Sequence, residues 1–281
     1  MNFGFIGLGN IGLPIARDLI SPGNSLTVYD IMPERAEELG KLGARVAASP
    51  AEVASLSDIV GVCVRDDKEV RDVIEGADGI LGAARSGLVV AIHSTVRITT
   101  VKDIAINAEK NGVRIVDAPV TRSAATSSKK SVIFMIGGEP SDVDSMQPFL
   151  DLTAARVIKT GVLGTGMALK ICNNLLPLVT VVAANDAVRL AEAAGLDVKM
   201  LAEVTSANGV ASAILTSLLM QRAGAPLPTN IPIPSLESAI SIGKKDLSCA
   251  LDVARDFGLV LPAVAMASDA IAIALSGLRN N

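Results

Sequence analysis

The sequence predicts an α/β domain with a doubly wound, mostly parallel sheet, followed by an all-helical domain. Up to about residue 161, short apolar runs alternate with amphipathic segments. This alternation is typical of a parallel sheet with crossover helices. After residue 161 the strand pattern stops and helical periodicity takes over. We therefore expect one domain over residues 1–161 and a second over residues 162–281.

The first domain contains apolar runs of strand length, and helical patterns separate several of them. The expected strands are Phe3–Ile6, Ser25–Tyr29, Ile59–Val64, Leu88–His93, Arg114–Asp117, Ser131–Gly137 and Ala155–Lys159. The expected helices include Leu13–Ile20, Arg35–Leu42, Lys68–Glu75 and Val101–Asn111.

The second domain opens with a near-continuous helical pattern over Met167–Ala194, long enough to form an interdomain helix. Pro177 lies inside this pattern, and proline removes one N–H and clashes with the preceding turn, so we expect a kink there. The proline-rich stretch 225–234 is expected to be a loop. The further expected helices are Val198–Ser206, Val210–Ala223, Ser235–Phe257 and Pro262–Leu278.

The start of the chain has the order strand, glycine turn, helix, strand and acidic residue. Gly7 permits the tight turn, Gly9 lets the backbone approach a pyrophosphate, and Gly12 lets helix and strand pack closely. The helix N-terminus adds unpaired N–H groups and the positive end of its dipole. This order predicts a dinucleotide site in a Rossmann-type domain, with a turn that binds no phosphate as the alternative. The expected cofactor-binding residues are Gly7, Leu8, Gly9, Asn10, Ile11 and Gly12, with Asp30 and Ile31 after the second strand.

Asp30 indicates which dinucleotide is bound. Its carboxylate can accept hydrogen bonds from ribose hydroxyls, and it would repel a 2′-phosphate. We therefore expect NAD as the cofactor and consider NADP the weaker candidate.

Composition argues against several other classes of protein. The 281 residues carry a net charge of −4 and only 2% are aromatic, which disfavours nucleic-acid binding. The apolar run Leu175–Ala184 is too short to span a bilayer, so we expect a buried helix and no membrane partner. One histidine and three cysteines without ligand spacing predict no metal site, and the cysteines are expected to be reduced and buried. Because the first strand begins at the first methionine, no secretory signal is expected and the predicted location is cytoplasmic.

Lys170 and Asn174 are candidate catalytic residues near the start of the long helix. Four residues apart, they project from one helix face. The helix dipole and desolvation would lower the pKa of Lys170 towards a useful acid/base value, while the Asn174 amide could hold a hydroxyl or carbonyl. From spacing alone, a solvated helix face is the simpler interpretation. Asn173 is expected to be a packing or capping neighbour.

Four separated segments resemble the β-hydroxyacid dehydrogenases, the family of 3-hydroxyisobutyrate dehydrogenase and tartronate semialdehyde reductase. These segments are Gly4–Gly12, Asp117–Thr121 with Met135–Gly138, Gly164–Leu175 and Lys244–Leu247. The resemblance implies that Lys170 is the catalytic acid/base and that Asn174 positions the substrate.

The same resemblance implies further cofactor contacts. Thr95 would touch the nicotinamide side, and Val64 and Arg65 match a segment that lines the cofactor, where the family usually has proline at the position of Arg65. Lys245 would reach the cofactor from the helical domain, oriented by Asp246; an exposed helix charge is the alternative for Lys245. The neighbouring Lys244 is expected to be solvated.

The expected substrate loop departs from the family pattern. Where the family reads Ser-Gly-Gly, this chain has Thr121, Arg122 and Ser123, which we expect to contact the substrate. Thr121 keeps a hydroxyl, but side chains replace two glycines where backbone would otherwise approach closely. Arg122 could bind a carboxylate or could point into solvent, and both readings stay open. A non-standard substrate is therefore expected.

Together these features predict an NAD-dependent oxidoreductase that interconverts a 3-hydroxy acid, or a related small hydroxy compound, and its aldehyde or ketone. The alternatives are reduction of C=N bonds, as by imine-reducing relatives, and an NAD-binding scaffold or sensor without turnover. Imine-reducing relatives commonly lack the lysine, so Lys170 argues against that alternative. His93 is expected to pack or hydrogen-bond rather than act in catalysis. The apolar central helix predicts a homodimer or higher homo-oligomer.

Overall fold

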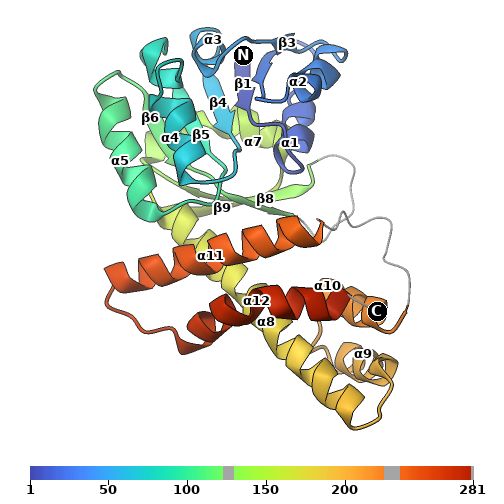
Figure 1. The fold of residues 1–281 in the computed structure, drawn as a ribbon. Coiled ribbons are helices and arrows are strands. Elements are labelled where there is room, and N and C mark those ends of the chain that lie inside the picture. Colours follow the sequence, from blue (N-terminus) through green and yellow to red (C-terminus); the bar gives the residue numbers. More distant parts are fainter. Residues whose placement is uncertain (123–129, 225–234, 280–281) are drawn as a thin grey trace. The chain divides into compact units, whose positions relative to one another are not determined.

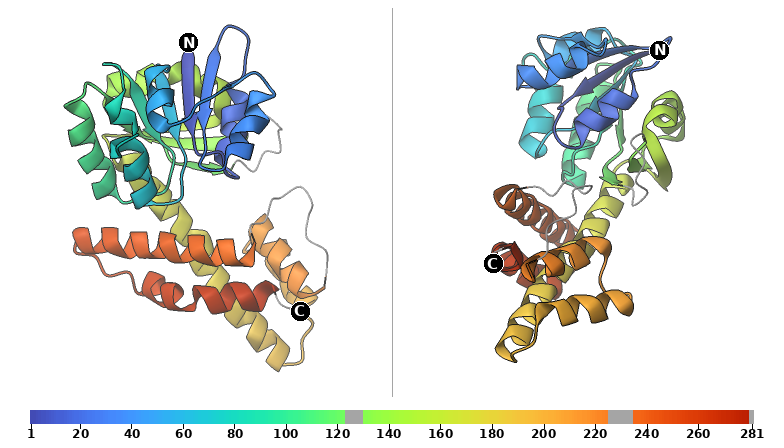
Figure 2. Two further views of the ribbon diagram at one scale, coloured as in Figure 1. Left: turned by 45° about the horizontal axis from the view of Figure 1, so that its top comes forward. Right: turned by 90° about the vertical axis from the view of Figure 1, so that its right-hand side faces the viewer.

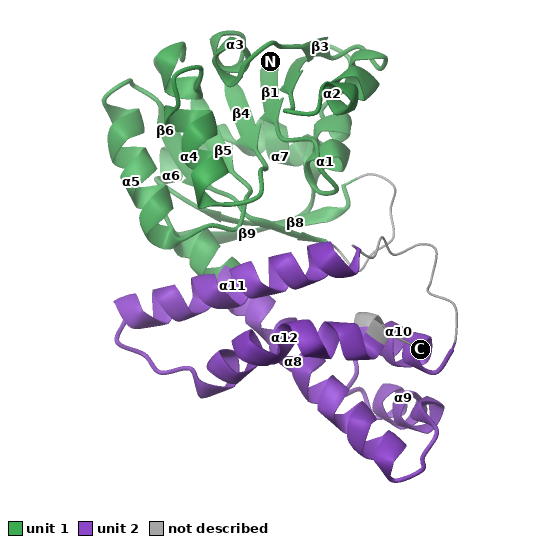
Figure 3. Cartoon of the chain, in the orientation of Figure 1, with its two compact units in different colours: residues 1–170 green, residues 171–281 purple. Residues whose placement is uncertain are grey.

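The computed structural model of this chain describes residues 1–122, 130–224 and 235–279. The chain forms two compact units, residues 1–170 and residues 171–281, which Figure 3 colours separately. The first unit is an α/β domain and the second is helical, so the predicted fold class is confirmed (Figure 1).

Within the described residues, nine strands of the first unit form one sheet, in the order β3-β2-β1-β4-β5-β6-β8-β7, with β9 also paired to β8. The strands from β3 to β6 along this order are parallel, which is the strand order of doubly wound nucleotide-binding domains. β8 runs antiparallel to β6 and β7 and parallel to β9. The bounds are β1 Asn2–Ile6, β2 Ser25–Tyr29, β3 Arg45–Val46, β4 Ile59–Val62, β5 Val89–Ile92, β6 Arg114–Asp117, β7 Val120–Arg122, β8 Val132–Gly137 and β9 Ala154–Gly161.

Helices cover both faces of this sheet (Figure 2). On one face, Phe3, Phe5 and Phe134 from the strands pack with Ile15 of α1 and Phe149 of α7 in a buried core. Burying such large apolar side chains is the main stabilising contribution to a unit of this kind. The helices are α1 Gly12–Asp18, α2 Pro33–Gly40, α3 Pro50–Ser55, α4 Asp67–Glu75, α5 Ile98–Glu109, α6 Pro140–Ser145 and α7 Gln147–Thr153, with a 3₁₀ turn, η1, at Ile80–Gly82.

The strands and helices expected from the sequence are present, with ends that differ by a few residues. Sequence patterns missed β3 and β7 because strands this short show no clear alternation. They also missed α3, α6 and α7, which are too short to display helical periodicity.

The second unit contains most of the long helix α8 and the helices that follow. α8 runs without interruption through Pro177, which is exposed. Val188 of α8, Val198 and Ala202 of α9, and Leu215 and Leu219 of α10 form the main buried cluster. The bounds are α8 Thr165–Ala193, α9 Val198–Ala207, α10 Ala213–Arg222, α11 Leu236–Asp256 and α12 Pro262–Arg279. The expected loop at 225–234 lies outside the described residues.

The division between the compact units falls inside α8, after Lys170. The sequence placed the boundary at residue 161, where β9 ends. The first turn of α8 belongs to the sheet unit because Gly164 and Met167 are hydrogen-bonded to the end of β6. Lys170 is therefore the last residue of the unit that carries the glycine turn.

Two expectations about burial are wrong. Leu175–Ala184 was expected to be a buried helix, but Leu176 is 72% exposed. Only 17% of the most apolar 18-residue stretch of α8 is buried, although the helix is long and apolar enough to cross a bilayer. Cys172, on the same helix, is exposed, whereas Cys63 is half-buried and Cys249 is buried; none of the three is in a disulfide. Apolar composition alone could not reveal that the described part of the chain leaves this stretch of α8 largely exposed.

Candidate cofactor and active site

The glycine turn lies where the strand order reverses, at the carboxyl end of β1 between β2 and β4. Gly7 has a φ of +90°, and a Cβ there would lie 2.2 Å from the carbonyl oxygen of Cys63. A Cβ on Gly12 would lie 2.0 Å from the carbonyl oxygen of Gly7. A Cβ on Gly9, in contrast, would meet nothing within 4 Å. Gly7 and Gly12 thus serve close packing, and Gly9 borders open space of the kind that a pyrophosphate needs.

The start of α1 completes this turn. Leu13 donates its N–H to the carbonyl of Gly9, so the helix begins directly after the turn. The N-cap residue, Ile11, has an apolar side chain that cannot accept from the first N–H groups of the helix. These groups and the helix dipole suit an anion.

Asp30 is buried beside the turn. Its Oδ2 accepts the N–H of Leu8 at 2.6 Å, and its Oδ1 accepts the N–H of Met32 at 2.8 Å. Arg35 Nη1 lies 3.7 Å from Oδ1, and its side chain is half exposed. Asp30 therefore fixes the turn to the end of β2, and the guanidinium of Arg35 lies next to the Asp30 carboxylate. Ile31 is 84% exposed.

Arg122 also lies at the glycine turn. At the end of β7, its Nη2 donates to the carbonyl oxygen of Asn10 at 3.0 Å. The sequence left open whether Arg122 binds a carboxylate or points into solvent. In the structure its guanidinium is exposed and is also anchored to the glycine turn. Thr121 is half-buried on the same strand, and Ser123 lies outside the described residues.

A hydrogen bond joins the two segments that follow β4 and β5, at the carboxyl ends of these strands. Val64 donates its N–H to Ser94 Oγ at 2.8 Å, and Thr95 follows, half-buried. The side chain of Arg65 is 86% exposed and pairs with Glu69 of α4. The backbone of Val64 and Arg65 thus lies at the carboxyl end of β4, where the segment that lines the cofactor was expected. The Arg65 side chain, in contrast, lies along α4.

His93 is packed in the core, as the sequence predicted. Its Nδ1 is 2.8 Å from the carbonyl oxygen of Ala118, and its ring stacks on Phe5 and Phe149 with centroids 5.7 and 5.6 Å away. Burial lowers the pKa of His93 to about 4, against the opposing hydrogen bond with Ala118. The imidazole is therefore neutral at physiological pH.

Lys170 is half-buried in the second turn of α8, in the same unit as the glycine turn. Burial raises the pKa of the Cys63 thiol to about 12, and the charge of Lys170 opposes that rise. The charge of Lys170 thus acts on the thiol that directly follows β4. The first turn of α8 is fixed by Asp117, whose two carboxylate oxygens accept the N–H groups of Gly164 and Met167.

A second polar group lies in the helical unit, around the buried Asp246. Asp246 Oδ2 accepts from Asn174 Nδ2 at 2.7 Å, and Oδ1 is 2.9 Å from Lys245 Nζ. Asp246 thus orients Asn174 as well as Lys245. The Lys245 side chain is only 29% exposed, unlike that of a freely solvated lysine, whereas Lys244 is exposed.

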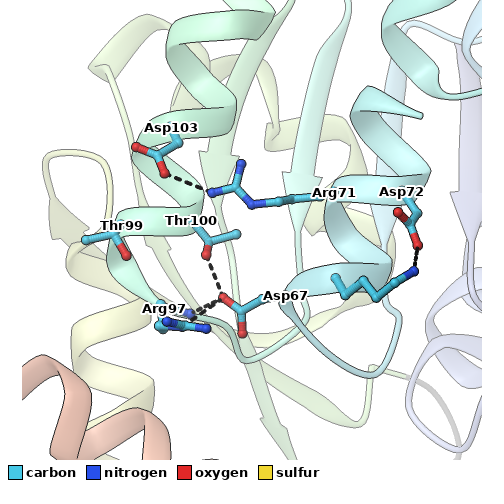
Figure 4. Close-up of a pocket in the computed structure, with 8 residues that line it drawn as sticks. Asp67, Arg71, Asp72, Arg97, Thr99, Thr100 and Asp103 are labelled. Carbon is cyan, nitrogen blue, oxygen red and sulfur yellow. Dashed lines mark hydrogen bonds and ion pairs between the residues drawn. The ribbon is translucent and has the colours of Figure 1, made fainter. Parts of the chain in front are cut away.

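A cavity of about 450 Å³ lies between the starts of α4 and α5 (Figure 4). Its charged side chains neutralise one another: Asp67 accepts from Thr100 and faces Arg97, and Arg71 pairs with Asp103. None of the predicted site residues lines it. It is not part of the candidate site.

The structure adds three contacts that sequence reasoning missed. Asp117 anchors α8, Arg35 lies beside Asp30, and Asp246, which was expected to orient Lys245, also holds Asn174. Asp117 offered one signal, because it is a charged residue at the end of an apolar strand. These three contacts became visible only in the folded chain.

The strand order, the glycine turn and the buried Asp30 define a nicotinamide-dinucleotide-binding domain joined to a helical domain. Two family models match the chain accordingly. Residues 2–161 match the NAD binding domain of 6-phosphogluconate dehydrogenase, and residues 164–281 match the NAD-binding domain of NADP-dependent 3-hydroxyisobutyrate dehydrogenase. The chain belongs to the β-hydroxyacid dehydrogenase family of NAD(P)-binding oxidoreductases.

Known proteins similar to this chain support the assignment. An uncharacterised oxidoreductase of Mycobacterium tuberculosis is 35% identical over 97% of this chain and 92% of its own length. The mitochondrial 3-hydroxyisobutyrate dehydrogenase of Mus musculus is 35% identical over 72% of this chain and 60% of its own length. A solved Mycobacterium tuberculosis 3-hydroxyisobutyrate dehydrogenase with L-serine has a TM-score of 0.80 and 27% identity, covering 99% of each chain. An imine reductase from Pseudomonas sp. shares the fold, with a TM-score of 0.62, 19% identity, and coverage of 98% of this chain and 93% of its own.

Proposed function

We propose that this protein is a dehydrogenase that uses a nicotinamide cofactor to interconvert a 3-hydroxy acid, or a related small hydroxy compound, and its aldehyde or ketone. The observation that carries the proposal is the placement of Lys170. Its helix is anchored to the unit that contains the glycine turn, and its charge lowers the pKa of the Cys63 thiol, which follows β4. The 3-hydroxyisobutyrate dehydrogenases similar to this chain favour a hydroxy acid as substrate.

The cofactor would lie at the glycine turn. The N–H groups at the start of α1 would hold the pyrophosphate, next to the open space at Gly9. Thr95 and Val64 would contact the nicotinamide side, and Lys245 would add a cation from the helical unit. When bound, the nicotinamide accepts or supplies the hydride. Arg122 uses one of its five N–H donors at Asn10, so its remaining donors can take an anion of the cofactor or the substrate.

We propose NAD as the preferred cofactor. Asp30 is fixed by two main-chain N–H groups, and its negative charge would oppose a 2′-phosphate. Arg35, 3.7 Å from Asp30, would attract the same phosphate. The buried carboxylate is nearer the turn than the half-exposed guanidinium, and this supports NAD.

Lys170 would exchange the proton of the substrate hydroxyl, and Asn174 would hold the substrate oxygen. On a continuous helix these residues lie one turn apart on one face. Because Asn174 Nδ2 is held by Asp246, the orientation of the amide is fixed before substrate arrives, which reduces the entropy lost on binding. Thr121, Arg122 and Ser123 would contact the rest of the substrate.

The exposed face of α8 supports a homodimer. Leu176 and Leu190 on α8, and Met266 and Ile273 on α12, are each at least 67% exposed. Large apolar side chains gathered on exposed helices are typical of an oligomer interface. A second copy of this chain would cover them.

The test is a panel of small hydroxy acids with NAD or NADP, measured on the wild type and on Lys170→Ala. We expect oxidation of at least one hydroxy acid, and a loss of about a hundredfold or more in kcat in the variant. Lys170→Arg is the matched control, because it keeps the charge but remains protonated at all usable pH values and should be nearly as impaired.

Two results would contradict the proposal. Reduction of cyclic imines that survives Lys170→Ala would favour an imine reductase. Tight NAD binding with no turnover of any substrate would favour a scaffold.

A further inference from the structure

Asp117 ends β6 and is fully buried. Its Oδ1 accepts the N–H of Gly164 at 2.7 Å, and its Oδ2 accepts the N–H of Met167 at 2.6 Å. These groups flank Thr165, the first residue of α8. A side chain 47 residues earlier in the chain therefore caps the helix that carries Lys170.

The cap has to come from outside the helix. Ala168 donates its N–H to the carbonyl of Gly164, which makes Gly164 the N-cap residue. Gly164 has a φ of +94°, and a Cβ there would lie 2.8 Å from Ile98 Cγ2. The Ser, Thr, Asp or Asn that normally caps a helix cannot occupy this position, and Asp117 supplies the missing acceptor.

The space around the carboxylate is closed by glycines. A Cβ on Gly137 would lie 2.7 Å from Asp117 Oδ1, and a Cβ on Gly166 would lie 3.0 Å from Oδ2. On the other side of the turn, Met167 is fully buried and its sulfur accepts the N–H of Val96 at 3.4 Å. α8 therefore cannot slide or rotate on the sheet without breaking the Asp117 hydrogen bonds.

The two hydrogen bonds also act on the carboxyl group itself. Burial raises the pKa of Asp117, and the N–H groups of Gly164 and Met167 oppose this rise. The N–H groups that hold the start of α8 therefore favour the carboxylate form of Asp117. Lys170 follows Met167 by about one helical turn on the same helix, so its place depends on this anchor.

We propose that Asp117 is a positioning residue for Lys170: it fixes the first turn of α8 on the sheet, and with it the place from which the Lys170 side chain extends. The proposal rests on the acid/base role of Lys170 given above. Asp117 would touch neither substrate nor cofactor, because its oxygens are enclosed by the backbone of α8.

Two substitutions disturb this anchor in different ways. Asp117→Asn keeps the shape, but its amide nitrogen cannot accept, so one of the two N–H groups loses its partner. Asp117→Glu keeps both acceptor oxygens but is one methylene longer and pushes the helix away. Each should lower kcat about tenfold or more while KM changes less, because a displaced lysine impairs proton transfer more than substrate binding.

A second readout needs no turnover. The rate at which an amine-selective reagent labels Lys170 in the cofactor-free protein at one fixed pH, followed by peptide mass spectrometry, reports how the amine is held. This rate should differ from that of the wild type in both Asp117 variants. The matched control is Asp142→Asn, which removes another buried carboxylate of the same unit, one paired with Arg114. It should change neither kcat nor the labelling rate.

The outcomes separate this proposal from the proposed function. If Lys170→Ala keeps full activity, the acid/base role fails whatever Asp117 does. If Lys170→Ala is inactive but both Asp117 variants keep the wild-type kcat and labelling rate, the positioning role is overturned. Failure of both variants to fold would overturn it as well, because the carboxylate would then serve stability alone.

Discussion

The first turn of α8 and its middle are both apolar, yet they have opposite surroundings. Met167 is fully buried against the sheet unit, whereas Leu176 is 72% exposed. The first turn is hydrogen-bonded to Asp117 at the end of β6 and to Val96 before α5. In the middle of the helix, Leu176 points outward in the single chain. One helix is thus buried at one end and exposed further along, and Lys170 lies where the two parts meet.

A matched pair of truncations on this helix would break or sharpen the comparison. Met167→Ala should destabilise the protein by about 2–5 kcal/mol, because it opens a cavity and removes the acceptor of Val96. Leu176→Ala should cost the monomer much less, since most of its side chain is already in solvent. Urea unfolding monitored by circular dichroism measures both.

The second part of this test is assembly. Sedimentation should show that Leu176→Asp weakens the dimer, whereas Met167→Ala leaves it intact. Equal losses of stability in the two alanine variants would contradict the division of α8 into anchored and open parts.

The stability of the sheet unit, whose core contains His93, should also depend on pH. The pKa of His93 in the fold, about 4, is below its usual value of 6.5, so the unfolded chain binds this proton more readily. The contribution of neutral His93 is complete above pH 6.5 and is lost as the pH falls towards 4, by about 3 kcal/mol. Because His93 is the only histidine, one imidazole signal in the NMR spectrum reports it directly.

The stability of a His93→Gln variant, compared with the wild type between pH 4 and 7, isolates this contribution from that of the carboxylates. The difference between the two proteins should shrink as the pH falls. A wild-type imidazole that titrates near pH 6.5 would show instead that the ring is accessible to water.

The smallest effect is expected at the ribose end of the cofactor site. Arg35→Ala removes the cation beside Asp30, so NADP should bind about three- to tenfold more weakly and NAD should be nearly unaffected. Fluorescence titration of the two cofactors measures this. Tighter binding of NADP than of NAD by the wild type would show that Arg35, not Asp30, decides the preference.

Most of the fold could be read from the sequence because its signals are local. The alternation of apolar runs and helical patterns predicted a mostly parallel sheet, and Gly7, Gly9 and Gly12, between a strand and a helix, predicted the dinucleotide turn. Five short elements were not predicted, namely β3, β7, α3, α6 and α7. The helices have less than two turns and the strands two or three residues, which is too short for a periodic pattern.

The candidate site was less predictable because the residues that hydrogen-bond to one another there are distant in sequence. Asp117 and Gly164 are 47 residues apart, Asn174 and Asp246 are 72 apart, and Arg122 and Asn10 are 112 apart. Such contacts depend on which strand lies beside which helix, and no local pattern encodes that. The exposure of Leu176 and Cys172 escaped for a related reason: an apolar helix looks the same whether its own chain or a second copy covers it.

The central claim, that the amine of Lys170 meets the substrate hydroxyl, is tested most directly by a crystal structure of the wild type with NAD and a hydroxy acid that the panel identifies. We predict Lys170 Nζ within about 2.6–3.2 Å of the hydroxyl oxygen, with Asn174 on the same oxygen and Asp117 still bonded to Gly164 and Met167. A complex in which the substrate is bound productively while the Lys170 amine points into bulk solvent would contradict the account.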